Sequence, residues 1–477
     1  MSAHPSDTGA PLQDQEESVS ITRVPDTIVI PVQQPERPKP TPLPKLQLFI
    51  VFYIQLAEPI ASTVIYPFVN QLVRATGVTG GDQRKTGYFA GLIESAFYAT
   101  EAICVLQWGR ASDRLGRKPI LLGGLLGMTL SMLGFGLSRK FWSVVLARCA
   151  EGALCGNIGV CKGMIAEITD ASNMAEAFAY LPMVWAAGAT LGPLIGGVLA
   201  QPAEHWPKTV GKSLPSQSNR PGFKRALMLP TEDIEKDVAT DTANIGQTAA
   251  PTTTPDELQE SSLRTLRSLL HRRIVTAIIC YAFLAFIDQC MVVLQPLMYS
   301  SSISLGGLGF SSFAIGLIMG VWGVFNGLFS IFAFPRVLRI FGARRLYMIS
   351  FAGYLVCLAA FPILGVLARK SGRVDGKVWA VLIIQLVAYM LAYMSYGCIF
   401  ILVNEGAPRA ALGALNGLAQ TVASLMRAVA PSTASSLFSA SLERTIISGD
   451  LVYIVLLVIT ILGVGASTYI PKPTNSS

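Results

Sequence analysis

The chain has 477 residues, of which 52% are hydrophobic and only 14% are charged. A water-soluble enzyme or binding module needs far more polar surface, so this composition is typical of a polytopic membrane protein. The net charge of +8 does not indicate nucleic-acid binding, because the basic residues gather at the ends of apolar runs and form no basic stripe with interleaved aromatics.

The N-terminal residues 1–44 are rich in proline, glutamine, serine and threonine. They cannot bury enough apolar surface to fold alone, so we expect a disordered cytosolic tail. The first apolar run begins at Leu46, too far along the chain for a cleavable signal peptide. We therefore expect this first span to act as the signal anchor.

The first span, about 46–69, contains Glu58 and Pro59 near its middle. An ionisable side chain at that depth costs at least about 2.5 kcal/mol on insertion scales and by default faces a cavity or a partner. Pro59 removes a backbone hydrogen bond and favours a kink at the same depth. Glu58 is therefore our first candidate for coupling to protons or substrate. The alternative is a protonated carboxyl that only packs.

A short charged turn joins the second apolar run, 88–108, to the third, 119–137. The single acid of this turn is Asp113. It lies at a helix boundary, where its carboxylate can accept hydrogen bonds from a helix N-terminus or from a neighbouring arginine. We call this predicted contact the latch, and the alternative is a positive loop that only sets orientation. The latch residues are Gly109, Asp113, Arg114, Gly116, Arg117 and Lys118.

Further ionisable residues lie inside the apolar runs. Glu94 and Glu101 are seven residues apart in the second run, on nearly one helical face, with Glu101 deeper. The fourth run, about 142–165, carries Arg148 and Glu151 at i,i+3, close enough to pair. We add Glu101, Arg148 and Glu151 to the coupling candidates. A self-satisfied structural pair of Arg148 and Glu151 is an equal alternative.

The fifth run, about 178–200, contains a string of small residues. Glycines at such spacing let another helix pack closely, and a proline bends the helix at that contact. The residues of this string are Gly188, Gly192, Pro193, Gly196 and Gly197.

The sixth span cannot be drawn, because residues 201–271 contain no apolar run longer than a few residues. Apolar runs resume at 273–298, 313–334, 346–367, 378–402, 410–438 and 451–470, which gives about eleven spans. The basic residues put the 109–118 turn and a later turn at 336–345 on the same face, so the two halves disagree by one crossing. We divide the chain into a tail of 1–44, an N-terminal bundle of 45–200, a polar linker of 201–272, a C-terminal bundle of 273–470 and a tail of 471–477.

The second half repeats the first faintly and carries its own polar residues. Asp288 lies near the middle of the 273–298 run and is the counterpart of Glu58. Gln385, Asn416 and Gln420 are weak candidates for a substrate cavity, with interhelical hydrogen bonding as the alternative. The three histidines lie outside the apolar runs and the eight cysteines form no CxxC pair, so we expect no metal site, no cofactor and no enzymatic activity.

Three strings resemble signatures of one family. The 109–118 turn resembles the loop motif of the major facilitator superfamily, with Ala111 where leucine is usual. The segment 146–152 resembles its Arg-x-x-Gln-Gly motif, with Glu151 in place of glutamine. The glycine string resembles the antiporter signature of facilitator exporters, although Ala179 stands where its upstream member is usually glycine or serine. The Trp108-Gly109 form of the turn is also similar to that of zinc-induced facilitators.

The resemblance implies an all-α membrane fold of two six-helix bundles, here with the sixth span missing. It implies alternating access by a fungal-type multidrug efflux pump, which exports drugs, toxins or secondary metabolites through the lipid bilayer of the plasma membrane, driven by protons. In that case Glu58 and Asp288 couple the proton to the small organic substrate, and the latch stabilises the outward-facing state. We expect a monomer.

Three rival interpretations stay open. A symporter is disfavoured by the antiporter string. A vacuolar facilitator of a metal chelator or an organic anion is favoured by Trp108-Gly109. A non-transporting relative is favoured by the missing span.

Overall fold

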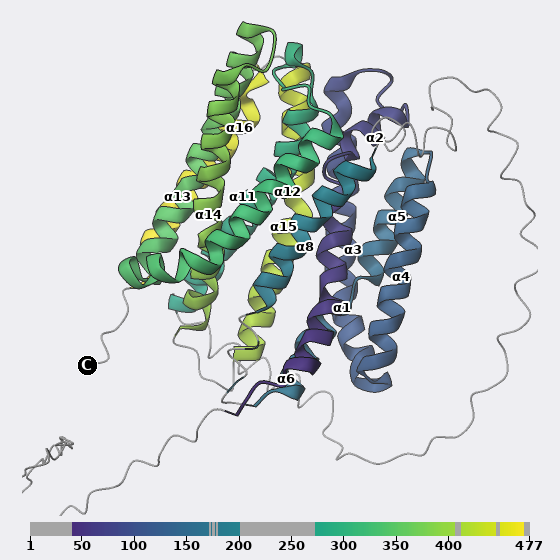
Figure 1. Cartoon of the computed structure of the whole chain (residues 1–477), viewed down its shortest axis with the longest axis vertical. Coiled ribbons are helices and arrows are strands. Elements are labelled where there is room, and N and C mark those ends of the chain that lie inside the picture. The colour runs from purple at the N-terminus through teal and green to yellow at the C-terminus, as the bar shows by residue number, and fades with distance from the viewer. Residues whose placement is uncertain are drawn as a thin grey trace, which may run out of the picture. The chain divides into compact units, whose positions relative to one another are not determined.

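The computed structural model describes residues 41–170, 173, 177, 180–200, 272–405, 412–444 and 449–471, and within them it contains helices and no strands. Apart from Thr41, these residues belong to one compact unit, Pro42–Ser477 (Figure 1). The helices are α1 (Lys45–Thr63), α2 (Val69–Ala75), η1 (Gln83–Lys85), α3 (Thr86–Leu115), α4 (Arg117–Leu137), α5 (Phe141–Leu154), α6 (Asn157–Ile168), α8 (Leu181–Leu199), α11 (Arg272–Ser300), η3 (Ile303–Leu305), α12 (Ser312–Phe332), α13 (Phe334–Ser371), α14 (Gly376–Asn404), α15 (Leu412–Glu443) and α16 (Leu451–Thr468).

Eight helical segments of the described residues are long and apolar enough to cross a membrane: α1, α4, the combined α5–α6 segment, α11, α12, α13, α14 and α16. Helices α3, α8 and α15 pack among them in the same bundle. The all-α membrane architecture implied by the family resemblance is therefore confirmed. The predicted gap at the sixth span and the 201–272 linker lie outside the described residues, except that Arg272 opens α11.

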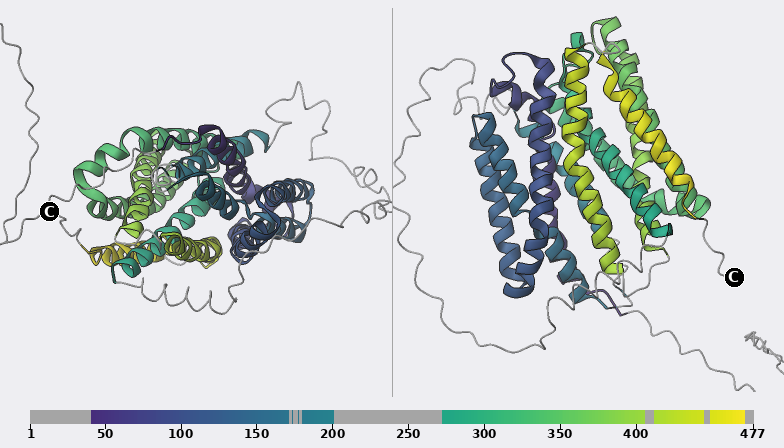
Figure 2. Two further views of the ribbon diagram at one scale, coloured as in Figure 1. Left: turned by 90° about the horizontal axis from the view of Figure 1, so that it is seen from below. Right: turned by 180° about the vertical axis from the view of Figure 1, so that it is seen from behind.

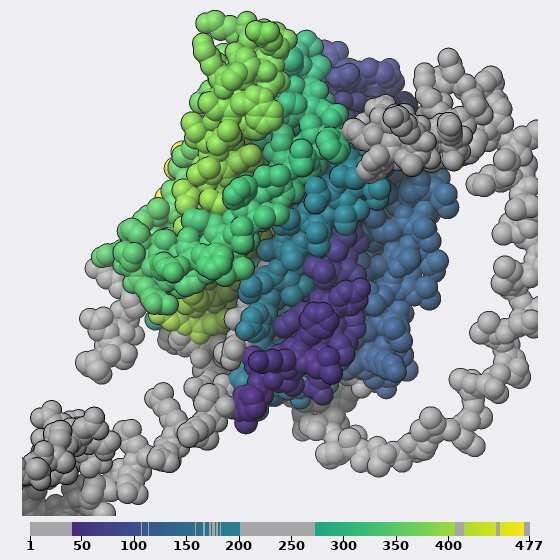
Figure 3. Space-filling model, in the orientation of Figure 1, coloured from purple at the N-terminus to yellow at the C-terminus, as the bar shows by residue number. Residues whose placement is uncertain are grey.

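Two helix pairs join the N-terminal helices to the C-terminal ones. Helix α3 packs along α15 (Figure 2), and α8 packs along α12. Small residues allow these close approaches: a Cβ atom on Gly197 of α8 would lie 2.7 Å from the Cα of Gly316 in α12. Helix α8 also lies beside α1 on one face of the bundle (Figure 3). Helix α8 thus contacts both halves.

We call the end of the bundle that holds the 109–118 turn the turn end, and the opposite end the far end. Hydrogen bonds join the two halves toward the far end. The Tyr88 hydroxyl donates to Oε2 of Glu443 at 3.0 Å, and Nη1 of Arg74 donates to the Ser300 carbonyl at 3.1 Å. The N-terminus of α3 and the C-termini of α11 and α15 therefore meet at the far end.

Two helices differ from the apolar runs that predicted them. The first run extends to Val69, but α1 ends at Thr63 and a turn leads into α2. The Thr63 hydroxyl donates to the Pro59 carbonyl at 2.6 Å, a local bond of the kind that bends helices next to a proline.

The fourth run is broken at Cys155 and Gly156 into α5 and α6. The Trp108 indole packs against Gly156, where a Cβ would collide with it. The same indole donates from Nε1 to the Ala153 carbonyl at 2.7 Å, which satisfies a carbonyl that the helix break leaves without its intrahelical partner. A tryptophan from α3 therefore stabilises the break.

The two halves repeat one backbone feature. Gly116 between α3 and α4 has φ 90° and ψ 157°, and Gly342 within α13 has φ 71° and ψ 157°. Positive φ favours glycine because it lacks a Cβ. The faint repeat of the first half in the second therefore includes this backbone conformation.

Candidate functional site

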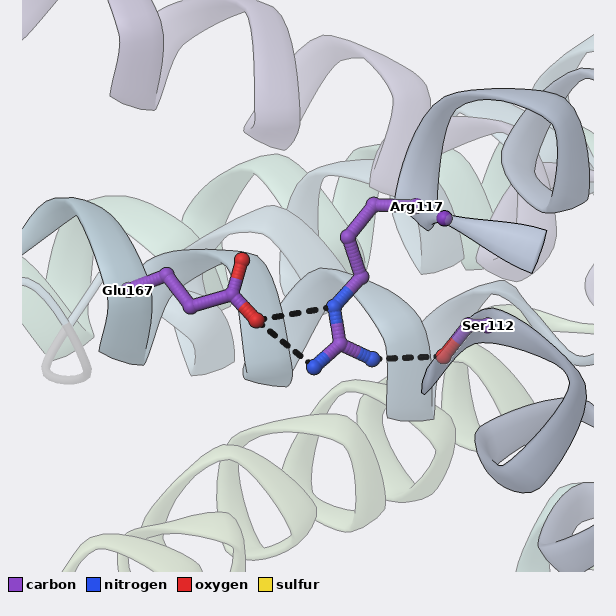
Figure 4. A pocket seen from close by; sticks show the side chains of 4 residues that line it. Ser112, Arg117 and Glu167 are labelled. Atoms are coloured by element: carbon purple, nitrogen blue, oxygen red, sulfur yellow. Dashed lines mark hydrogen bonds and ion pairs between the residues drawn. The ribbon is translucent and has the colours of Figure 1, made fainter. Parts of the chain in front are cut away.

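Arg117 in the 109–118 turn binds an acid of another helix. Its Nε and Nη2 donate to Oε1 of Glu167, at the end of α6, at 3.0 and 2.7 Å, and its Nη1 donates to the Ser112 hydroxyl at 2.5 Å (Figure 4). These side chains and Gly116 line a pocket at the surface. The contact ties α4 to α3 and α6 within the N-terminal half.

The structure describes the other predicted latch residues to different extents. Arg114 and Lys118 are exposed, and no atom lies within 4 Å of the position of a Cβ on Gly109. The side chain of Asp113 lies outside the described part of the chain. Glu167 was not a sequence candidate, because nothing in the sequence pairs an acid with an arginine fifty residues earlier.

A second group, the Arg148 cluster, is buried between α1, α3 and α5. Nη1 of Arg148 donates to Oε2 of Glu151 at 2.8 Å, and Nη2 lies 3.5 Å from Oε2 of Glu94. The guanidinium carbon lies 4.5 Å above the centroid of the Phe97 ring, a cation–π contact. The predicted Arg148–Glu151 pair is therefore present, and Glu94 is a second acid on the same base.

Glu58 is buried at the proline kink of α1. Its Oε2 accepts a hydrogen bond from Nε2 of Gln55 at 3.1 Å, and the carboxyl also interacts electrostatically with the thiol of Cys155. Electrostatic interactions also link Glu58 to Glu101 of α3 and Lys162 of α6. Glu58 and Glu101, two of the coupling candidates, therefore share one site with a lysine.

Arg427 of α15 reaches this site from the other half. It interacts electrostatically with Glu58 and Glu101. It also interacts electrostatically with Tyr281 and Tyr396, and its guanidinium carbon lies 5.9 Å from the ring centroid of Trp185 in α8. We call Glu58, Glu101, Lys162 and Arg427 the central charge cluster. The side chains that interact with Arg427 come from helices of both halves, and Arg427 itself is only partly buried.

Asp288 of α11 is the acid of the C-terminal half. Its Oδ1 accepts hydrogen bonds from the hydroxyls of Tyr354 and Tyr389, each at 2.9 Å, and its Oδ2 accepts one from Tyr396 at 2.9 Å. Tyr396 therefore connects the Asp288 carboxylate to the Arg427 guanidinium. The acids predicted in the two halves are linked through one arginine and one tyrosine.

The glycine string of α8 forms the contacts that its spacing predicts. Gly188 packs on the ring of Pro59, Gly192 on Thr63 and Gly196 on the Val64 carbonyl. On the opposite side, Gly197 and the Pro193 carbonyl pack on Gly316 of α12. A side chain at these positions would separate α8 from α1 or from α12.

A sequence profile of the Major Facilitator Superfamily matches residues 51–207 and 224–431. The chain belongs to the major facilitator superfamily. The recognition made from the three strings is confirmed.

Several similar proteins support the same family. The chain is 28% identical to the major facilitator-type transporter psiT2 of Psilocybe cyanescens, over 91% of this chain and 92% of that protein. It is 28% identical to the efflux pump azaK of Aspergillus niger, over 85% and 84%, and 27% identical to the protein ZINC INDUCED FACILITATOR 1 of Arabidopsis thaliana, over 91% and 93%. A solved D-xylose–proton symporter shares the fold, with a TM-score of 0.61, 14% identity and coverage of 89% and 96%.

Within this facilitator, the three weak cavity candidates lie in different surroundings. Gln385 is buried, accepts a hydrogen bond from the Tyr299 hydroxyl at 3.0 Å and donates to the Cys357 carbonyl at 3.0 Å. Asn416 is exposed and donates to Oδ1 of Asn404 at 2.9 Å, and Gln420 is partly buried. The bonds of Gln385 and Asn416 are the interhelical or local ones that the alternative interpretation describes.

Arg427 and Lys162 are the site residues that sequence ranking missed. Arg427 stands in the same run as Asn416 and Gln420, and Lys162 stands in the fourth run. The sequence did contain a sign of them: a basic side chain inside an apolar run costs free energy to bury, and such residues are by default candidates for a functional role. Their partners lie on helices remote in sequence, so only the fold shows which acids they meet.

Proposed function

We propose that this facilitator is a proton-coupled antiporter that exports small organic compounds by alternating access. The observation that carries the proposal is the position of Arg427, where carboxylates from both halves converge on one base. The relatives named as efflux pump and multidrug transporter support the direction and the substrate class.

Charge balance in the interior gives the proposal its mechanism. The carboxylates of Glu58, Glu101 and Asp288 face two bases, Arg427 and Lys162, so one negative charge is left over when all are ionised. An uncompensated charge in a low-dielectric interior is costly, and either a proton or a bound cation removes it. Protonation of Glu58 or Glu101 also weakens the attraction between the N-terminal half and Arg427, which makes it easier for the halves to separate.

The contacts between helices allow the movement that this mechanism needs. The glycine contacts of α8 with α1 and α12 let the two halves rock without side chains between the backbones. With the 109–118 turn in the cytosol, hydrogen bonds such as Tyr88–Glu443 close the outer side of the described state. The latch would then stabilise the opposite, outward-facing state.

Transport by purified protein in liposomes tests the proposal. A pH gradient should drive uptake of a fluorescent drug into these liposomes, and Glu58→Gln and Asp288→Asn should each abolish that uptake. The matched control is Asp82→Asn, the same kind of change in the loop between α2 and η1, where hydrogen bonds from Arg84 lower the pKa of the carboxyl. Unchanged gradient-driven uptake in both site variants would contradict the coupling assignments. No uptake by the wild-type protein of any tested compound would favour the non-transporting relative.

A second candidate is a facilitator of the vacuolar membrane that moves a metal chelator or an organic anion. The 27% identity to the protein ZINC INDUCED FACILITATOR 1 and the Trp108-Gly109 form favour it. A fluorescent fusion of the full chain separates the two: signal at the cell surface supports the exporter, and signal at the vacuole supports this candidate.

A further inference from the structure

The Asp288 carboxylate is held by hydroxyls and not by a base. It accepts three tyrosine hydrogen bonds, and no lysine or arginine forms a salt bridge with it in the described part of the chain. A carboxylate can accept about four hydrogen bonds, so these donors leave room for one more partner on Oδ2. Such donors stabilise the ionised form without neutralising its charge.

Aromatic rings stand around this carboxylate. Trp322 of α12 stacks on Tyr389, with centroids 4.5 Å apart and an interplanar angle of 10°. Tyr393 stands at 87° to the Trp322 ring, with centroids 6.0 Å apart, and lies 5.2 Å from Tyr396. Tyr389, Tyr393 and Tyr396 follow one face of α14 at i, i+4 and i+7. We call Asp288, Trp322, Tyr354, Tyr389, Tyr393 and Tyr396 the Asp288 cage.

The cage has a buried side and an accessible side. Asp288, Tyr354 and Tyr389 are buried, whereas Trp322, Tyr393 and Tyr396 are partly exposed. Among these three, the Tyr393 hydroxyl makes no hydrogen bond to any described residue, while the Trp322 indole donates to the Leu386 carbonyl at 2.9 Å. The accessible side therefore offers ring faces and one free hydroxyl in front of an anionic group.

The nearest base does not cancel the charge of the cage. Arg427 forms no salt bridge with Asp288 and acts on it and on Tyr396 through longer-range electrostatic interactions. It also faces the two glutamates of the N-terminal half, Glu58 and Glu101. Its positive charge is thus already matched in the central charge cluster. The Asp288 cage keeps one carboxylate that a cation can balance.

We propose that the Asp288 cage binds the substrate and that this substrate is an organic cation, a protonated or quaternary amine attached to a flat apolar body. The carboxylate attracts the positive charge, the ring faces hold it by cation–π contacts, and the indole and tyrosine rings pack on the apolar body. The inference rests on the proposed export function and adds the substrate class. It also separates two roles: Asp288 binds the organic cation, and Glu58 and Glu101 bind the proton.

Equilibrium binding of a matched pair of compounds tests the cage. The probes are tritiated 1-methyl-4-phenylpyridinium, which is permanently charged, and 4-phenylpyridine at alkaline pH, which has nearly the same shape without the charge. The full-length protein in lipid nanodiscs should bind the cation about tenfold or more tightly than the neutral compound. Asp288→Asn should weaken cation binding by about tenfold or more and leave the weak neutral binding in place, whereas Asp82→Asn should match the wild type.

A second variant pair protects the test against misfolding. Tyr393→Leu removes a ring face and should weaken cation binding by about three- to fivefold, and Tyr393→Phe should retain most of the affinity that Tyr393→Leu loses. Each variant should elute as a single species in size-exclusion chromatography. Equal binding of the two probes, no cation binding by the wild type, or unchanged binding in Asp288→Asn would overturn the proposal.

Transport separates failure of this inference from failure of the proposed function. If a pH gradient drives movement of a neutral compound while the cation does not bind, the cage proposal is wrong and the antiporter proposal stands. If the cation binds as expected but no gradient moves it, the cage proposal stands and the antiporter proposal is wrong.

Discussion

At the scale of single residues, the interior of this facilitator is organised around arginines. Arg148 holds Glu94 and Glu151 within the N-terminal half, and Arg427 connects Glu58 and Glu101 to the tyrosines around Asp288. The first arrangement is closed inside one half, and the second crosses between halves. From this difference we propose a structural role for Arg148 and a coupling role for Arg427.

Replacing Arg148 tests the structural assignment. Arg148→Met leaves two buried acids without their base, so we expect a loss of about 3–5 kcal/mol in unfolding free energy. The triple variant Arg148→Met, Glu94→Gln, Glu151→Gln should regain most of that stability, because no uncompensated charge remains. Chemical unfolding in detergent, followed by tryptophan fluorescence, measures both. Equal stability of the single and triple variants would contradict a charge-based explanation.

At the scale of elements, glycines of α8 allow this helix to pack closely on both α1 and α12. A Cβ on Gly196 would collide with the Val64 carbonyl of the α1–α2 turn, and backbone cannot move aside as a flexible side chain can. Gly134 of α4 is a suitable control glycine, because it also lies in a helix but nothing lies within 4 Å of the position of a Cβ on it.

Gly196→Ala should therefore destabilise the protein by about 1–3 kcal/mol through overpacking and should slow transport. Gly134→Ala should be neutral or stabilising by up to about 1 kcal/mol, because alanine is the better helix former. Thermal unfolding and liposome uptake, measured side by side on the two variants, give the comparison. Equal effects of the two changes would mean that α8 does not pack on α1 as described.

The helices themselves were predictable, because apolar runs long enough to span a bilayer have few alternative structures. The ends of the helices were harder to predict. The apolar run to Val69 does not indicate that α1 stops at Thr63, and the break at Gly156 depends on a tryptophan almost fifty residues earlier. Individual costly residues such as Glu58 and Asp288 could also be identified. Their partners could not, since Arg427 lies far from them in sequence and meets them only after the halves assemble.

At the scale of the whole molecule, the two described ends that flank residues 201–271 lie at opposite ends of the bundle. Gly197 packs beside Ser312 and Gly316 at the start of α12, and Ser300 ends α11 next to Arg74 at the far end. Helix α8 therefore ends at the far end, while α11 spans about 43 Å by its 29 residues and begins at the turn end. The geometry agrees with the odd crossing that the basic residues indicated.

Ala200 and Arg272 should consequently face opposite sides of the membrane. We expect a glycosylation acceptor inserted directly after Ala200 to be modified in the endoplasmic reticulum and one inserted directly before Arg272 to stay unmodified, because the basic residues predict that the 109–118 turn, and with it the start of α11, is cytosolic. The shift in gel mobility on glycosidase treatment reads out each variant. An acceptor inserted into the α13–α14 connection after Gly372 is the positive control, since α13 ends at the far end, where Gly365 packs on Gly306. Modification at both test positions, or at neither, would mean that the two halves do not have the relative orientation in which Arg427 meets Glu58, and the coupling proposal would then lose its basis.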